Sequence, residues 1–201
     1  EWTWVQQADL KISIHAKLLD IAVKQNLGWA NELQEKFRRN GKEVDRERVD
    51  ALAEGMEERR GVPLMEDQAE VFERCEALLG KGGEEGWKAL ESTSKEVEMK
   101  MKYFPPKEGE RSVGTGKAVG VVDCSAEEVA AWVMDYCSND RMRSSREEGN
   151  PARFELREKT RGNENTVATV KKMPLMLDNR EFVVRQLWKA ERGKVRVAIE
   201  S

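Results

Sequence analysis

The sequence predicts an α+β protein in which an α-helical segment, residues 1–64, precedes a segment dominated by an antiparallel sheet, residues 65–201. Apolar residues recur at helical spacing through the first eighty residues, and from residue 97 they alternate at strand spacing. The composition adds a limit, because 36% of the 201 residues are charged and 39% are hydrophobic. We therefore expect a modest apolar core with solvated helices and loops around it.

The expected helices in the first eighty residues cover residues 9–25, 29–39, 45–58 and 65–79. In the second of them, Trp29, Leu33 and Phe37 stand four residues apart, which places them on one helix face. Turn-forming residues at 40–41 and 61–63 interrupt the helical pattern. The narrow apolar stripes and many charges of these helices are typical of segments that dock a protein partner.

Strand spacing begins at residues 97–103, where Val97, Met99 and Met101 alternate with charged residues. Ser125 and Glu128 then form a capping-box pattern ahead of a helix, because each side chain can bond the other residue's backbone N–H. Further strands are expected at residues 116–123, 153–157, 165–171, 180–189 and 194–200, joined by short turns. Consecutive strands with short turns predict an antiparallel meander.

The charge balance and the scarcity of metal-binding residues exclude several function classes. A net charge of −3 and a pI of about 5.6 argue against a general nucleic-acid binder, which needs a basic face. We interpret Arg141, Arg143 and Arg146 as a solvated basic cluster. One histidine and three cysteines without a C-x-x-C pattern leave little material for a metal site or a catalytic triad. The odd cysteine count favours a reducing, intracellular compartment, and we expect no cofactor.

Two blocks in the second segment are similar to a known family. The stretch from Gly120 to Trp132, a valine-rich strand that runs into a serine-capped helix, resembles the entry to the second helix of a START (StAR-related lipid-transfer) domain. The stretch from Met173 to Val183 is similar to the family's signature of a proline loop followed by arginine, an acid and phenylalanine. Trp87 also suits the family, and the resemblance covers roughly residues 65–201.

The resemblance implies a helix-grip fold, in which a curved antiparallel sheet wraps a long C-terminal helix around a lipid-sized cavity. It also implies binding of a sterol, a phospholipid or a sphingolipid without catalysis, for lipid transfer or sensing. Such a protein would be cytoplasmic and would bind membrane surfaces transiently, as a peripheral protein. The alternative is a protein-interaction or scaffold module with the same fold and no lipid, whose N-terminal helices bind a partner. An enzyme on this scaffold would need an ionisable group on the cavity face, and none is convincing.

The sequence departs from the family pattern in two respects. The chain begins at Glu1 and stops at Ser201 directly after a strand, so we expect a fragment that lacks the family's final strands and C-terminal helix. Some family members also hold an acid–base pair inside the cavity. The position that is arginine in those members is Gln186 here, and the preceding strand offers Thr166, Val167 and Ala168 without an acid. Polar recognition would then fall to Gln186 and Thr166.

The predicted cavity lining combines the resemblance with strand alternation. Alternation places Phe182, Val184, Gln186 and Trp188 on one face, which we expect to include Phe154 and Leu156. The lining is completed by Thr166, Ala168, Val129 and Trp132. An ordinary core would show the same alternation, and this alternative stays open. Gln186 is the exception, because a buried amide without a partner costs roughly 1–3 kcal/mol. A ligand, a water or a backbone group would supply that partner.

An apolar run with loop character follows the fourth expected strand, and it consists of Met173, Pro174, Leu175, Met176 and Leu177. One interpretation is a loop at the cavity mouth that touches the membrane during lipid exchange. The other is a buried loop that packs on the sheet. Methionine is flexible enough to serve in either place.

Overall fold

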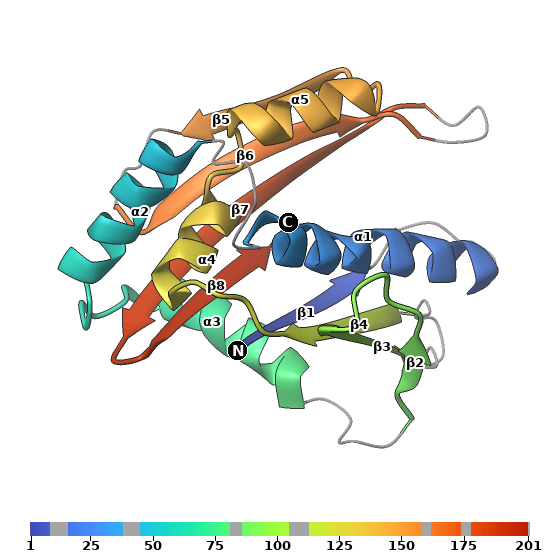
Figure 1. Cartoon of the computed structure of the whole chain (residues 1–201), viewed down its shortest axis with the longest axis horizontal. Helices are drawn as coiled ribbons and strands as arrows, with labels where there is room; N and C mark the ends of the chain where they lie inside the picture. The colour runs from blue at the N-terminus through green and yellow to red at the C-terminus, as the bar shows by residue number, and fades with distance from the viewer. Residues whose placement is uncertain are drawn as a thin grey trace. The chain divides into compact units, whose positions relative to one another are not determined.

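Figure 1 shows the computed structural model of the chain, which divides into two compact units. The first unit contains Glu1–Lys42 and Glu76–Asp123, and the second contains Glu43–Cys75 and Cys124–Ser201. The predicted division into residues 1–64 and 65–201 stays a prediction. The structure describes residues 1–8, 16–37, 45–80, 86–104, 113–157, 162–173 and 178–200.

The first unit holds a four-stranded antiparallel sheet with one helix packed against it. The strand order is β1-β4-β3-β2. The strands are β1 (Trp2–Ala8), β2 (Lys88–Leu90), β3 (Val97–Phe104) and β4 (Val113–Gly120), and the helix is α1 (Ala16–Lys36).

The core of the first unit lies between α1 and one face of this sheet. The alternating residues Val97, Met99 and Met101 of β3 pack there against Leu27 and its neighbours on α1. Gly116 of β4 allows α1 to pack closely on the sheet, because a Cβ at this position would lie only 2.8 Å from Leu27 Cδ1. The charged residues that alternate with this set therefore lie on the opposite face of the sheet.

The second unit is built on a four-stranded antiparallel meander of strand order β5-β6-β7-β8. Its strands are β5 (Ala152–Arg157), β6 (Glu164–Lys171), β7 (Arg180–Glu191) and β8 (Lys194–Glu200). Its helices are α2 (Arg46–Glu58), α3 (Glu66–Gly80, of which the part up to Cys75 belongs to this unit), α4 (Ala126–Met134) and α5 (Asn139–Glu147). A two-residue turn joins β7 to β8, and its Gly193 adopts a φ of 70° that favours glycine.

Helices pack on both faces of the second sheet. On one face, Val71 and Phe72 of α3 form a buried cluster with Leu187 of β7 and Ala198 of β8. On the other face, α4 contacts β7 and β8, and α2 packs against α4. We call these the α3 face and the α4 face. An ion pair between Arg48 and the buried carboxylate of Asp135, with an Nη2–Oδ1 distance of 2.6 Å, joins α2 to the end of α4.

Much of the predicted secondary structure is confirmed. The α+β class is correct, and the expected helices at 45–58 and 65–79 correspond to α2 and α3. The capping box is present: the Glu128 N–H donates to Ser125 Oγ at 3.1 Å, and the Ser125 N–H donates to Glu128 Oε2 at 2.8 Å. The described strands form two separate antiparallel sheets, and the helix-grip arrangement stays a prediction.

Other details of the prediction are wrong. Residues 2–8 form the strand β1 within the stretch that was predicted to be helical. Residues 16–36 form the single helix α1, so the predicted interruption before Trp29 is absent there. The strand predicted at 116–123 is β4, which begins at Val113 and ends at Gly120. The short strand β2 and the charged helix α5 were not predicted. Among the described helices, none combines the length and the apolar composition that a membrane crossing requires.

Candidate functional site

Strand register determines which predicted site residues share a face of the second sheet. In an antiparallel pair, directly opposed residues project to the same side. Asn165 lies opposite Gln186, and Asn165 Nδ2 donates to the Met134 carbonyl at the end of α4 over 3.2 Å. Gln186 therefore lies on the α4 face. The alternating residues Phe182, Val184 and Trp188 lie on the same face, as predicted.

The other strand residues of the predicted lining lie on the α3 face. Phe154 is opposite Ala168, Ala168 is opposite Val183, and Thr166 is two residues from Ala168. The expectation that Phe154 shares a face with Phe182 is therefore wrong. Phe154 is 39% exposed and Ala168 is fully buried.

Leu156 lies where the β5–β6 register shifts between Glu155 and Arg157, and this side chain is 48% exposed. Such a bulge places two residues opposite one and re-aims the side chains beyond it. The simple alternation from which Leu156 was placed on the face of Phe182 does not hold across this point.

Two buried amides lie opposite each other on β6 and β7, the two middle strands of the sheet, on its α4 face. Gln186 is 2% exposed and Asn165 is 4% exposed. Neither Gln186 Oε1 nor Asn165 Oδ1 has a hydrogen-bond partner among the described residues. A buried acceptor without a partner is unfavourable, so both oxygens would be stabilised by accepting a hydrogen bond from a donor group. Sequence reasoning singled out Gln186 but missed Asn165, because the cross-strand neighbour is Asn165 and not Thr166.

The end of α4 borders this amide pair and is held by a buried arginine. Arg141 of α5 is 8% exposed, and its guanidinium carbon lies 4.2 Å from the centroid of the Trp132 ring. Arg141 Nη1 donates to the carbonyls of Val133 at 3.0 Å and Asp135 at 3.3 Å. A cation at a helix C-terminus and over an indole face is favourable on both counts. The interpretation of Arg141 as solvated is therefore wrong. Val129, the other α4 residue of the predicted lining, is half-buried.

Titratable groups near the α4 face are held in structural contacts. Burial raises the pKa of the Tyr136 hydroxyl, while the charge of Arg153, 3.7 Å above the ring, opposes that change. Arg153 Nε also donates to the Tyr136 carbonyl over 2.6 Å. Burial likewise raises the pKa of the Cys137 thiol, which disfavours the reactive thiolate.

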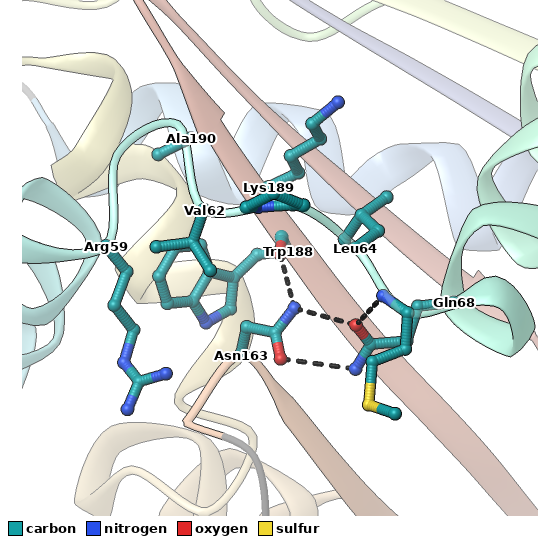
Figure 2. Close-up of a pocket in the computed structure, with 10 residues that line it drawn as sticks. Arg59, Val62, Leu64, Gln68, Asn163, Trp188, Lys189 and Ala190 are labelled. Carbon is teal, nitrogen blue, oxygen red and sulfur yellow. Dashed lines mark hydrogen bonds between the residues drawn. The ribbon is translucent and has the colours of Figure 1, made fainter.

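A pocket of about 140 Å³ lies where the segment between α2 and α3 passes the end of β7, and it shares Trp188 with the α4 face (Figure 2). Val62, Leu64 and Trp188 supply apolar walls, and the side chains of Gln68 and Asn163 close one side. These two amides bond each other reciprocally at 3.2 and 3.3 Å, so the polar wall is already satisfied. The remaining lining residues are Arg59, Pro63, Met65, Lys189 and Ala190.

The predicted cavity-mouth loop is described only at its first residue. Met173 is half-buried, while Pro174, Leu175, Met176 and Leu177 lie outside the described residues. Among the described residues, no group of three or more His, Cys, Asp or Glu side chains could hold a metal ion.

Comparison of the chain with protein-family models, with curated proteins and with solved structures found no match.

Proposed function

We propose that this chain is a lipid-binding module of START type, which holds a hydrophobic ligand without catalysis for transfer or sensing. The ligand would lie against the α4 face of the second sheet, in a helix-grip arrangement. The protein would work in the cytoplasm and contact membranes transiently. A strand, a serine-capped helix and a meander follow one another in the order that the resemblance implies, which supports the proposal.

The observation that carries the proposal is the unsatisfied amide pair. Core positions are rarely given to amides that lack partners, because each orphaned acceptor costs roughly 1–3 kcal/mol. Gln186 and Asn165 lie among apolar residues of the α4 face, and both are almost completely buried. A hydrophobic ligand with a hydrogen-bond donor would compensate both oxygens and bury its apolar part at about 25 cal/mol per Å².

The experiment is native mass spectrometry of the purified protein, followed by organic extraction and lipid analysis. The expected result is an added mass equal to one lipid, and a smaller occupied fraction in a Gln186→Met variant of equal purity. A matched control is Gln68→Met on α3, which changes a buried amide outside the α4 face. Protein that carries no added mass, and takes up none from mixed vesicles, would reject the proposal.

A second candidate function is a protein-interaction module, and the pocket of Figure 2 is the observation that favours it. Val62 and Met65 line this pocket and are 51% and 54% exposed. An apolar side chain of a partner would fit between them and Trp188. Under this alternative, Val62→Asp abolishes partner binding and leaves lipid occupancy unchanged, whereas Gln186→Met has no effect on the partner.

A further inference from the structure

The edge strand β1 of the first sheet lacks the features by which proteins usually prevent a sheet edge from pairing with another chain. Such features are a short strand, charged residues, proline and bulges. β1 spans the seven residues Trp2–Ala8 and contains no charged residue and no proline. Its pairing with β4 runs along the whole strand without a register shift. β1 is therefore a regular, uncharged edge, and its tryptophan, threonine and valine residues favour strand structure.

The other three edges of the two described sheets each carry one of these features. β2 is only three residues long. β5 is interrupted by the register shift between Glu155 and Arg157. β8 contains three charged residues among its seven, namely Lys194, Arg196 and Glu200. Among the described strands, β1 is thus the edge at which pairing with a further strand is least opposed.

Backbone groups along the outer side of β1 can accept such a strand. In an antiparallel sheet, a strand directs about half of its N–H and C=O groups to each side, and β1 has a neighbour, β4, on one side only. The groups on its other side have no hydrogen-bond partner among the described residues. A strand added along this edge would satisfy them.

We propose that β1 pairs antiparallel with β1 of a second copy of this chain, about a two-fold axis perpendicular to the sheet. Opposed residues of an antiparallel pair lie on the same face, so one residue of β1 must lie directly opposite its own copy. The register that uses all seven residues opposes Val5 to Val5 of the second copy and Trp4 to Gln6. Because β1 carries no charge, no like charges are opposed within this pairing.

The packing of α1 leaves room for the second copy. α1 lies over β4 and β3, so the two α1 axes would be at least about 14 Å apart, three strand spacings of about 4.8 Å. Packed helices need only about 8–10 Å. Trp4 lies on the α1 side of β1, and its ring centroid is 4.9 Å from that of Trp29. The two Trp4 residues would be diagonal neighbours across the two-fold axis, about 7–8 Å apart, which is within reach of aromatic rings. A second copy thus supplies apolar contacts that a strand of arbitrary sequence would lack.

The proposed assembly closes at two copies. Its continuous sheet would have the order β2-β3-β4-β1-β1-β4-β3-β2, so both outer edges would be the three-residue strand β2. An edge that short offers little for a further strand to pair with. The dimer is independent of the proposed lipid site, because β1 belongs to the first unit and that site to the second.

The test is analytical ultracentrifugation of the full chain over a concentration series, together with amide hydrogen exchange. The mass should rise to twice the 23.0 kDa of the chain, and the β1 amides should exchange more slowly as it does. Val5→Glu places two carboxylates opposite each other at the axis and should raise the dimer dissociation constant about tenfold or more. Within the chain the new carboxylate opposes Lys117 of β4, a favourable pair, so loss of the dimer cannot be attributed to unfolding.

A charge swap makes the test specific to this register. Val5→Lys should also dissociate the dimer, and an equimolar mixture of Val5→Glu and Val5→Lys chains should restore it, because opposite charges then meet at the axis. The control Val5→Thr keeps a branched side chain without a charge and should leave the dimer intact. A dimer that Val5→Glu does not weaken, or a mixture that does not associate, would overturn the proposal. A chain that stays monomeric throughout the series would also overturn it, and would point to a different protein as the donor of the strand.

Discussion

Two buried glutamines of the second unit should respond in opposite directions to the same substitution. Gln186 and Gln68 are each 2% exposed, and methionine matches glutamine in chain length while lacking its amide oxygen and nitrogen. Gln186 Oε1 has no partner among the described residues, whereas Gln68 belongs to a network with Asn163 and Glu164. In lipid-free protein, Gln186→Met should therefore stabilise the fold and Gln68→Met should destabilise it.

The contacts set the expected size of each effect. Gln68 Nε2 donates to Asn163 Oδ1 at 3.2 Å and to Glu164 Oε2 at 3.1 Å, and Gln68 Oε1 accepts from the Met65 N–H at 3.3 Å. With about 1 kcal/mol for each lost bond, Gln68→Met should cost about 2–4 kcal/mol. Removing the orphaned oxygen of Gln186 should gain about 1 kcal/mol. The two variants should then differ by about 3–5 kcal/mol.

Urea unfolding of delipidated protein, followed by tryptophan fluorescence and by circular dichroism, measures both changes. Coincident transitions by the two probes would establish that a single free energy of unfolding applies. Thermal midpoints should separate by roughly 2–4 °C for each kcal/mol. A loss of 1 kcal/mol or more in Gln186→Met would refute the reasoning, because it would mean that the Gln186 oxygen already has a partner in the lipid-free protein.

Three further outcomes follow from the packing and the charges. Gly116→Ala in β4 should destabilise the protein by about 1–3 kcal/mol in thermal melts, because the new methyl group meets the fully buried Leu27 of α1. The control is Gly28→Ala in α1, where a new methyl group has open space, and this variant should stabilise the protein by about 0.5–1 kcal/mol. Arg48→Met should cost about 2–3 kcal/mol in urea unfolding, because it leaves the Asp135 carboxylate buried without its cation; a loss below 0.5 kcal/mol would contradict a structural role for the pair. Burial raises the pKa of Asp45, but hydrogen bonds from backbone N–H groups of α5 lower it by more, so the folded pKa lies below the unfolded one. This carboxylate therefore stabilises the fold at pH values above its unfolded pKa, and that contribution is lost as the pH falls through the folded pKa. The stability difference between wild type and Asp45→Asn should therefore shrink below about pH 4, and a difference that is constant from pH 7 to pH 2 would exclude this linkage.

The sequence predicts the strongly patterned parts of the fold because their signals are local. Ser125 and Glu128 stand at the spacing that a capping box requires, and the structure contains both hydrogen bonds. Helix α5 gives a weaker signal: its N-cap Ser138 accepts the Arg141 N–H at 3.3 Å, but Met142 is the one large apolar residue among its nine, so no apolar periodicity marks the helix. Its first turn is held from outside by Asp45, whose carboxylate accepts the Asp140 N–H at 3.0 Å. A partner 95 residues away cannot be read from the local pattern.

The candidate site shows the same division between local and non-local information. Alternation correctly placed Gln186 and Trp188 on one face, because it depends on a single strand. The wrong face for Phe154 and the omission of Asn165 both came from pairing between strands, which depends on register. The bulge beside Leu156 changes that register by one residue. Since the side-chain period is two, one residue is enough to move a side chain to the other face.

The way in which the chain alternates between its two units has a consequence for the order of folding during synthesis. α3 emerges from the ribosome before β7 and β8, and Ala198, which belongs to the same buried cluster as Phe72, follows about 125 residues later. At ~5–20 residues per second, the apolar stripe of α3 would wait roughly 6–25 s for its partner strands. Until β7 and β8 are made, this stripe lacks the strands that bury it, and a pause in translation before residue 180 would prolong its exposure.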